Sequence, residues 1–463
     1  MTDLHDLSAV ELLFGYHEKK FSPSEVLEDV FARIARWEPH IQALYAFDPD
    51  GARAVAKSST ERWARSAPIG SLDGIPATIK ENIATKGVPV PLGSITTKLV
   101  MAEADAPPAA RMREAGAVIY SKTTMPDYGM LSSGLSSFHP LTRNPWDLSK
   151  NPGGSSAGAA AAGAAGYGPL HLGTDIGGSV RLPACWCGLF ALKPSLGRVP
   201  VDPPYVGRVV GPITRTVEDA ALMMSVLSQP DARDSMNLPP SSIHWQSLEQ
   251  SPKGLKIGLM LNLGFGMPLE DEVRTTVTTA AKLFEDAGAI VTEVPTAMTR
   301  EMLAGLDAFW RARSWDDISK LTPGEQKKVL PYIYEWAEQG ARLTGLDVIR
   351  GFNATMAMRA ASAKLFQSVD YVLSPVSPIV KFAAELASPL NDPAKPFDHI
   401  AYTACWNMSE QPAASINAGY DTSGFPIGLQ IIGKRFDDLG VLQMAKAFEE
   451  MRGPQRLWPK PPQ

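Results

Sequence analysis

The sequence predicts an α/β protein built on a large, mixed, partly parallel central β-sheet covered by helices on both faces. Two observations carry this prediction. Residues 256–260 and 290–294 are short apolar runs typical of buried strands, and residues 273–287 between them have a helical pattern that ends at Gly288. A strand, a helix and a strand in this order predict a βαβ unit with parallel strands. The chain also has 463 residues, of which 44% are apolar, enough for an extended core.

Residues 1–60 are expected to form an N-terminal helical part. Two segments, Ser8 to Glu11 and Ser22 to Glu25, have the spacing of a capping box, in which a hydroxyl and a carboxylate satisfy backbone N–H groups reciprocally. Pro23 follows at the first position of the second helix, which suits its fixed φ. The apolar residues of this helix fall on one face, which predicts that it packs on a larger body: Val26, Leu27, Val30, Phe31 and Ile34.

The segment from about residue 298 to residue 367 is helical in pattern and rich in aromatic residues. Two interpretations stay open: ordinary helix packing, or the lining of an apolar substrate pocket. Under the second interpretation, Trp310, Trp315 and Tyr332 contact substrate. No Pro-rich or Ser-rich linker divides the chain, so residues 1–463 are expected to form a single domain that includes this substrate-side segment.

Charge and hydropathy argue against two classes of partner. The chain carries 44 basic and 49 acidic residues, a net charge of −5, and no long basic run, so a nucleic-acid partner is not expected. The most apolar run, residues 157–167, is too short to cross a bilayer, and the first residues lack the pattern of a secretion signal. We therefore expect neither nucleic-acid nor membrane binding. The oligomeric state stays open, a homo-oligomer included.

The cysteines and the absence of several motifs limit the disulfide, metal and cofactor chemistry that is expected of this protein. Cys185, Cys187 and Cys405 are too few for a disulfide framework and favour a reducing, cytoplasmic location. Metal-ligand spacings and nucleotide-binding fingerprints are not found, so no metal and no cofactor is expected.

Residues 151–194 contain the densest cluster of glycine and serine residues that could take part in catalysis or binding. Ser155 and Ser156 stand where a helix of Ala and Gly could begin, and such a helix lets another backbone approach closely. Further on, Gly177, Gly178 and Ser179 can turn successive N–H groups into one concavity beside the Ser179 hydroxyl. That arrangement suits an oxyanion hole next to a nucleophile. A phosphate-binding loop is the alternative, but the Walker A pattern is missing.

A nucleophilic serine needs a base. None of the seven histidines lies in a recognisable triad motif, and the sequence has no GxSxG elbow. A lysine can take this role instead. Lys80 follows the apolar stretch 75–79, which places it at the end of a buried strand. Because most lysines in strands face water, this position alone does not identify a base.

Together these segments resemble the amidase signature family. Residues 74–82 fit its GIP-x-x-x-K-[DE]-N pattern, residues 153–156 its GGSS pattern, and residues 173–181 its GTD-x-GGS-[IV]-R pattern. Ser155 and Ser179 have the separation that the family shows. The resemblance runs from about residue 5 to residue 450 and implies the amidase signature fold. Further matching segments are residues 142–147, 193–194, 374–378 and 424–430.

The resemblance also implies roles for residues. Ser179 would be the acyl nucleophile, Ser155 a bridging serine that follows a cis peptide bond, and Lys80 the base. Thr174 would hydrogen-bond to the bridging serine. The oxyanion hole would be formed by backbone N–H groups, and a charged pair would brace its loop: Ile176, Gly177, Gly178 and Ser179 for the hole, Asp175 and Arg181 for the pair. The base must start uncharged, so activity is expected to rise toward alkaline pH.

Two departures from the family pattern concern the substrate side and the buried helix. Ala157 stands where the family usually has glycine. Glu410 replaces the glycine of N-x-x-G-x-P-A in residues 407–413, where it either selects substrate or caps a turn. Residues 125–130, which end at Met130, differ from the wording typical of the family's glutaminase subunits. Met130 and Glu410 are therefore counted among the candidate substrate contacts.

The resulting hypothesis is a hydrolase acting on linear amides, which cleaves the C–N bond of small carboxamides or aryl amides through an acyl-enzyme on Ser179. The alternative within the family is the glutaminase subunit of a tRNA-dependent amidotransferase, which would need partner subunits. An alternative of another class is a catalytically inactive binding or scaffold protein on the same fold. The sequence does not specify the physiological substrate.

Overall fold

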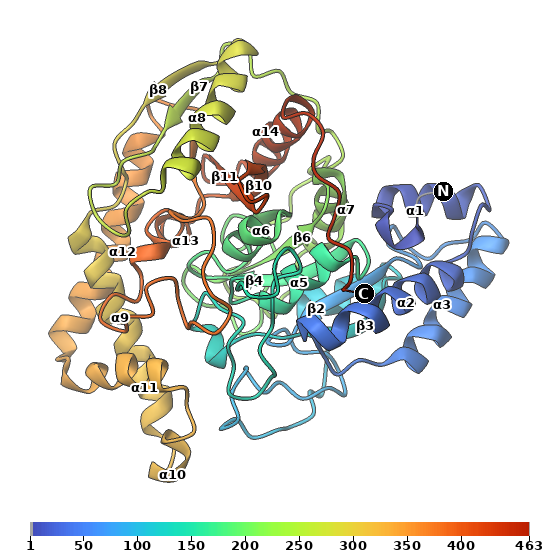
Figure 1. The fold of residues 1–463 in the computed structure, drawn as a ribbon, viewed down its shortest axis with the longest axis horizontal. Helices are drawn as coiled ribbons and strands as arrows, with labels where there is room; N and C mark the ends of the chain where they lie inside the picture. The colour runs from blue at the N-terminus through green and yellow to red at the C-terminus, as the bar shows by residue number, and fades with distance from the viewer. Residues whose placement is uncertain (1–2, 463) are drawn as a thin grey trace.

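The computed structural model describes residues 3–462 and is organised around one large sheet (Figure 1). Among these residues the sheet has 11 strands in the order β1-β3-β2-β4-β6-β5-β10-β11-β9-β7-β8. The strands are β1 Leu44–Tyr45, β2 Pro76–Lys80, β3 Val118–Thr123, β4 Leu170–Asp175, β5 Phe190–Lys193, β6 Val209–Thr214, β7 Lys256–Leu259, β8 Ile290–Glu293, β9 Tyr371–Pro375, β10 Ala413–Tyr420 and β11 Pro426–Gly433.

The helices of the described residues surround this sheet. The α-helices are α1 Ala9–His17, α2 Pro23–Ile41, α3 Pro49–Ala64, α4 Pro107–Glu114, α5 Ala157–Ala165, α6 Arg181–Cys187, α7 Val217–Leu227, α8 Asp271–Asp286, α9 Arg300–Ser319, α10 Pro323–Gln326, α11 Pro331–Glu338, α12 Gly345–Leu365, α13 Ala404–Met408 and α14 Asp438–Met451. Short 3₁₀ segments are η1 Leu4–Asp6, η2 Asp127–Gly129, η3 Gln339–Arg342 and η4 Asp398–Ile400.

The sheet is mixed and partly parallel, as the sequence predicts. Strand β2 runs parallel to β3 and β4, and β7 runs parallel to β8 and β9, whereas the remaining pairs are antiparallel. The predicted βαβ unit is confirmed as β7, α8 and β8, with Lys256 opposite Ile290.

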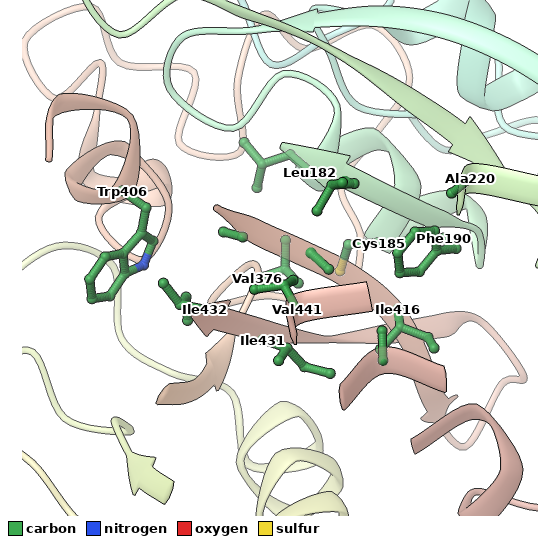
Figure 2. Close-up of a cluster of buried hydrophobic side chains, with 14 of the residues drawn as sticks. Leu182, Cys185, Phe190, Ala220, Val376, Trp406, Ile416, Ile431, Ile432 and Val441 are labelled. Atoms are coloured by element: carbon green, nitrogen blue, oxygen red, sulfur yellow. The ribbon is translucent and has the colours of Figure 1, made fainter. Parts of the chain in front are cut away.

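Both faces of the sheet are covered by helices. Consecutive side chains of a strand point to opposite faces, and the neighbours Ile431 and Ile432 of β11 are both fully buried. Helix α6 and helix α14 both pack on β10 and β11. Figure 2 shows side chains of these two helices, Cys185 and Val441 among them, meeting the strands in one apolar cluster.

The N-terminal helical part forms as predicted. Both capping boxes are present, at the start of α1 and of α2. The five apolar residues predicted to face inward on α2 are all buried. The end of the chain returns to this part of the molecule, where Arg33 Nη2 donates a hydrogen bond to the Pro459 carbonyl at 2.7 Å (Figure 1).

The predicted helical segment corresponds to α9 to α12, which stand together at one side of the molecule (Figure 1). Helices α9 and α12 pack along each other, with the rings of Phe309 and Phe352 edge to face at 5.6 Å. Part of the aromatic content of this segment therefore serves helix packing. That the whole chain is a single domain stays a prediction.

Within residues 3–462, none of the helices combines the length and the apolar character needed to cross a membrane.

Candidate active site

The site lies where two parallel strands end at the same edge of the sheet. Lys80 is the last residue of β2, and its parallel neighbour β4 ends at Thr174 and Asp175. Because carboxyl ends of parallel strands meet at one edge, these side chains come together. Lys80 Nζ lies 2.8 Å from Ser155 Oγ, 3.1 Å from Ser156 Oγ and 3.0 Å from Thr174 Oγ1. The three partners of the amine are thus hydroxyl groups.

The environment of Lys80 favours the uncharged amine. The side chain is fully buried, and this burial lowers the pKa of Lys80 to about 7, against the opposing charge of Asp175. Hydroxyl groups can donate as well as accept, so the same three partners suit the charged and the neutral amine. The site can therefore exchange a proton near neutral pH without rearranging these contacts.

Ser155 and Ser179 both line one cavity. Ser155 precedes α5 and follows a cis peptide bond from Gly154, in agreement with what the resemblance implies. Ser179 is half-buried and lies between β4 and α6. The two loops are joined by the backbone, since the N–H of Ser156 donates to the carbonyl of Ser179 at 3.1 Å. The structure thus brings Lys80, Ser155 and Ser179 to one place.

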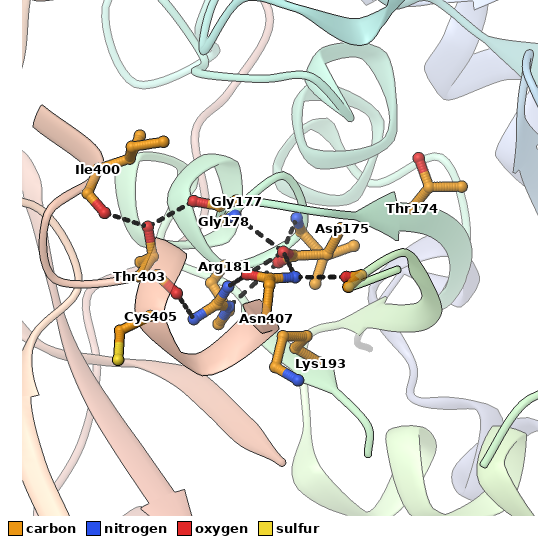
Figure 3. A network of polar contacts seen from close by, with 12 residues as sticks. Thr174, Asp175, Gly177, Gly178, Arg181, Lys193, Ile400, Thr403, Cys405 and Asn407 are labelled. Carbon is orange, nitrogen blue, oxygen red and sulfur yellow. Dashed lines mark hydrogen bonds and ion pairs between the residues drawn. The ribbon is translucent and has the colours of Figure 1, made fainter. Parts of the chain in front are cut away.

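Asp175 holds the loop that carries Ser179. Its Oδ1 accepts from the Gly178 N–H at 2.8 Å and its Oδ2 from the Val180 N–H at 3.1 Å. Arg181 adds two contacts, Nε to Oδ2 at 3.1 Å and Nη2 to Oδ1 at 3.0 Å (Figure 3). Burial by itself raises the pKa of Asp175, but the Arg181 guanidinium holds it well below its usual range. The buried pair is therefore ionised and fixes the loop from inside.

Helix α13 and the residue before it, Thr403, hold the same loop from the other side. Thr403 Oγ1 donates to the Gly177 carbonyl at 2.6 Å, and Asn407 Nδ2 donates to Asp175 Oδ1 at 2.9 Å (Figure 3). Arg181 Nη1 in turn donates to the Thr403 carbonyl at 3.1 Å. The sequence motifs did not assign a role to these two residues, although Asn407 opens the N-x-x-G-x-P-A motif.

Two predicted hydrogen-bonding roles need correction. The Gly178 N–H already donates to Asp175, so Gly178 is not available to the oxyanion hole; Ile176, Gly177 and Ser179 remain as candidates. Glycine is required at Gly178 because its φ is +130° and a Cβ would lie 2.6 Å from Thr403 Oγ1. Thr174 Oγ1 accepts from Lys80 and, at 3.1 Å, from Asn82 Nδ2, whereas the predicted hydrogen bond between Thr174 and Ser155 is not formed.

The cavity beside the two serines has a volume of about 450 Å³. We call the side formed by Ser155, Asp175 and Ser179, together with the fully buried Lys80 and Arg181 behind them, the catalytic wall. Another part of the lining is mostly apolar, and we call it the aromatic wall: Trp310, Trp336, Phe397, His399 and Ile400. A Cβ on Gly177 would lie 3.2 Å from Trp310 Cη2 and 3.3 Å from Ile400 Cδ1, so this wall rests directly on the loop before Ser179.

Of the predicted substrate contacts, Met130 and Trp310 line the cavity, whereas Trp315 and Tyr332 do not. Trp315 packs edge to face on Tyr334, with ring centroids 6.2 Å apart. The Tyr332 hydroxyl contacts Ser388 Oγ at 3.2 Å, and its side chain borders a small recess that shares lining residues such as Phe397 and His399 with the cavity. Both side chains pack against other parts of the protein. The helical periodicity of the sequence does not distinguish such positions from positions that line the cavity.

Glu410 does not line the cavity either. Its carboxylate is buried and forms ion pairs with Arg359 of α12 and with Arg435. The residue follows α13 with φ of +70°, the left-handed conformation that commonly ends a helix and favours glycine. This conformation explains why the family usually has glycine at this position. Glu410 itself connects α12 and Arg435 through its ion pairs, which is a structural role and not the selection of substrate.

Several polar residues of the cavity were not predicted from the sequence. His399 lies on the aromatic wall, while Arg208 and Arg313 line the cavity elsewhere, as do Asp202 and Asp317. Arg208 Nη1 donates to the Pro203 carbonyl at 3.3 Å, and the Arg313 guanidinium lies 4.0 Å from the ring centroid of Tyr205. No carboxylate of residues 3–462 is in an ion pair with either guanidinium. These positions belong to no motif, so no sequence signal marked them.

Metal-ligand geometry is rare in the described part of the chain. Within residues 3–462, one group of three potential ligands is close together, Asp3, His5 and Asp6 near the N-terminus. None of the three lines the cavity at Ser179.

Comparison with known proteins gives one family. A family model described as Amidase matches residues 25–442. A glutamyl-tRNA(Gln) amidotransferase subunit from Alkaliphilus metalliredigens is 31% identical over 487 residues, with 97% of both chains covered. The corresponding protein from Myxococcus xanthus is 32% identical over 481 residues, which cover 96% of this chain and 97% of that protein.

Solved structures agree with this family. A bacterial aryl acylamidase of the amidase signature enzymes superposes with a TM-score of 0.88 at 29% identity, with 97% of both chains covered. A glutamyl-tRNA(Gln) amidotransferase subunit from Thermotoga maritima superposes with a TM-score of 0.81 at 26% identity, over 100% of this chain and 99% of that one. On the sequence motifs, the fold and these matches, the chain belongs to the amidase signature family.

Proposed function

We propose that this protein hydrolyses the C–N bond of small amides through an acyl-enzyme on Ser179. One observation carries the proposal: the amine of a fully buried lysine contacts three hydroxyl groups, one of which belongs to Ser155 beside Ser179 in the cavity. A buried amine with a pKa of about 7 is a suitable base for a relay near neutral pH.

In the acylation step, Ser179 Oγ attacks the amide carbonyl carbon as its proton passes to Ser155. Ser155 gives its own proton to the neutral amine of Lys80, which becomes an ammonium ion. The carbonyl oxygen turns into an oxyanion that accepts from the free N–H groups of Ile176, Gly177 and Ser179. Such preorganised donors typically contribute a factor of about 10² to 10³ each.

Collapse of this intermediate breaks the C–N bond. Ser155 protonates the leaving amine and takes a proton back from Lys80, so the lysine is neutral again. A water molecule then attacks the acyl-enzyme by the same relay, which releases the carboxylic acid and restores Ser179.

The aromatic wall supports substrates with an apolar or aryl group. Trp336, Phe397 and Ile400 give the cavity that holds the candidate nucleophile an apolar side that a ring can contact. The similarity to an aryl acylamidase at 29% identity supports the same class.

A second candidate function is glutamine hydrolysis as an amidotransferase subunit. The curated relatives of 31% and 32% identity are named as such subunits and support it. Arg208 and Arg313 also support it, because an unpaired guanidinium in the cavity can bind the α-carboxylate of glutamine in a bidentate manner. Under this function the protein would work with partner subunits and with tRNA.

Labelling and turnover by the purified chain separate these functions. We expect a fluorophosphonate to modify the folded protein at Ser179, located by peptide mass spectrometry, and not to modify Ser179→Ala. Anilides and aryl carboxamides should be hydrolysed faster than glutamine at equal concentration. Preferred hydrolysis of glutamine would replace the first candidate by the second. No labelling and no turnover of any amide would contradict both and support a scaffold role.

A further inference from the structure

Two arginine side chains reach the cavity from different elements. Arg208 immediately precedes β6, whose first residue, Val209, pairs with Asp175 at the end of β4. This register places Arg208 beside the start of the loop that presents the oxyanion donors. Arg313 lies on α9, one turn after Trp310, and both residues line the cavity. Because residues three apart share a helix face, Arg313 continues the face that contributes to the aromatic wall.

The backbone of Arg208 is fixed, whereas most of its guanidinium has no partner. The Arg208 N–H donates to the Tyr205 carbonyl at 3.0 Å, and the carbonyl of the preceding Gly207 accepts from Asn407 Nδ2 at 3.0 Å. The side chain is half-buried, and within residues 3–462 its guanidinium donates only to the Pro203 carbonyl, through Nη1. Neither Nε nor Nη2 belongs to the enclosed polar atoms of the chain, so both are open to a ligand.

The guanidinium of Arg313 is held beside the same segment. It lies 4.0 Å from the ring centroid of Tyr205, and the residue is exposed. Burial lowers the pKa of Arg208, and the charge of Arg313 lowers it further. The two guanidinium groups are therefore close enough to repel each other. An anion placed between them offsets this repulsion and accepts hydrogen bonds from both.

Two carboxylates also line the cavity and limit its positive charge. They belong to Asp202 and Asp317, and in the described part of the chain neither forms an ion pair with Arg208 or Arg313. The charge of Asp202 opposes the effect of Arg313 on the pKa of Arg208. Both acidic residues are exposed, so water and salt screen their charges. They weaken an anion site without occupying it.

We propose that Arg208 and Arg313 are specificity-determining residues that bind a carboxylate carried by the substrate away from the scissile amide. Since Arg313 follows Trp310 on one helix face, the substrate class is an amide with an aromatic body and a carboxylate beyond it. A guanidinium binds a carboxylate through two parallel N–H bonds, which fixes the orientation of the substrate. The inference rests on the proposed amide hydrolysis at Ser179 and names the substrate class of that site.

The test compares pairs of substrates that differ in one charge. Acetamidobenzoates and carbamoylbenzoates, substituted at each ring position, are paired with compounds in which an acetyl group of similar shape replaces the carboxylate. We expect kcat/KM of the best carboxylate to exceed that of its acetyl partner by about 10- to 100-fold, the factor typical of hydrogen bonds to a charged group. Higher ionic strength should lower kcat/KM for the carboxylate and not for the acetyl compound, because salt screens exposed charges.

Variants assign this preference to the two arginines. Arg208→Gln should bring the carboxylate-to-acetyl ratio about tenfold closer to one, and Arg313→Gln, at an exposed position, several-fold closer. Arg208→Lys keeps the charge without the planar fork and should retain part of the preference. Asp202→Asn and Asp317→Asn remove competing charges and should raise the ratio. Arg300→Gln is the matched control, because Arg300 is exposed on α9 and does not line the cavity, and it should keep the wild-type ratio.

A binding measurement separates the anion site from the chemistry. Calorimetry with Ser179→Ala should show an acetamidobenzoate binding about tenfold more tightly than the corresponding acetyl compound. The same protein with the added change Arg208→Gln should lose most of this difference. If the proposed function is wrong and no amide is hydrolysed, this difference still tests the inference. If only the inference is wrong, the fluorophosphonate still labels Ser179 and uncharged anilides are still hydrolysed.

Three results would overturn the inference. They are a ratio near one in the wild-type protein for every pair, a ratio unchanged in both Arg208→Gln and Arg313→Gln, and an equal loss in Arg300→Gln, as expected if net charge alone attracts anions. The α-carboxylate of glutamine has the same chemistry, so glutamine is assayed beside the aromatic substrates. Preferred hydrolysis of glutamine that depends on both cavity arginines would support the anion site and contradict the aromatic body of the substrate.

Discussion

The two walls of the cavity differ in how their buried polar groups are satisfied. On the catalytic wall, Lys80, Asp175 and Arg181 have protein partners for their charged or ionisable atoms. On the aromatic wall, His399 and Trp310 have none within the described residues. Groups that act on a transition state must be held in place before substrate arrives, and the partners on the catalytic wall provide this. The aromatic wall instead offers the cavity mostly apolar surface.

The largest expected effect comes from removing the reactive groups of the catalytic wall. Ser179→Ala and Lys80→Met should each lower kcat on an aryl amide by about four to six orders of magnitude, the range seen when members of a catalytic relay are deleted. Single-turnover kinetics with the purified variants measure this loss.

Lys122→Met is the matched control for the lysine. Lys122 lies on the neighbouring strand β3, is also buried, and has a pKa that burial lowers to about 7, but its amine contacts the Ile83 carbonyl and Thr85 Oγ1 and not Ser155. A folded Lys122→Met protein should keep kcat within several-fold of the wild type. Wild-type turnover by Lys80→Met would show that the relay is not the source of activity.

A smaller effect is expected from the brace behind the Ser179 loop. Asp175→Asn removes the charge opposite Arg181, and breaking a buried pair in this way typically costs about 3–5 kcal/mol of stability. Because the loop presents the oxyanion donors, kcat should also fall about 10²- to 10³-fold. Urea unfolding and kcat measure the two effects, and Ser179→Ala, which loses activity but not the pair, is the comparison. A change in KM alone would contradict this account.

The pH profile sharpens the comparison, because the two walls contain groups that titrate in different ranges. Only the neutral amine of Lys80 accepts a proton, and the pKa of Lys80 is about 7 in the folded protein. Below pH 7 kcat should therefore rise about tenfold per pH unit, and above about pH 8 it should level off. His399, with a pKa lowered to about 3, should add no inflection between pH 5 and pH 9. A flat single-turnover profile over this range would contradict the role of Lys80.

The catalytic wall could be predicted from the sequence to a much greater extent than the aromatic wall. Lys80, Ser155 and Ser179 each lie in a contiguous sequence motif. The end of a strand or a tight loop fixes the spacing within each motif, so the motif can be identified in the sequence. Trp310 and Trp315 lie on the same helix, and only the packing of α9 against its neighbours decides that the first faces the cavity and the second does not. His399 comes from a third segment, far along the chain.

The errors within the motifs have a similar origin. A run of glycines predicts that N–H groups converge, but not which of them is already used, and here Asp175 takes the N–H of Gly178. The sheet itself was predictable in kind, since the β7–α8–β8 unit follows from local pattern. The order of its 11 strands depends on contacts between distant segments and was not predicted.

The smallest effect is expected outside both walls, at Glu410. The two arginines that pair with its carboxylate are 29% and 49% exposed, so each pair should contribute no more than about 1 kcal/mol. The left-handed backbone at this position costs a non-glycine residue about 1–2 kcal/mol, which Gly does not incur. Glu410→Gly should therefore unfold at higher urea concentration than Glu410→Ala, by about 1 kcal/mol in free energy. Because Glu410 does not line the cavity, both variants should keep kcat/KM within about twofold, the scatter expected of a change that touches stability alone. A tenfold change in KM for either variant would restore a substrate-selecting role for Glu410 and extend the recognition surface beyond the aromatic wall.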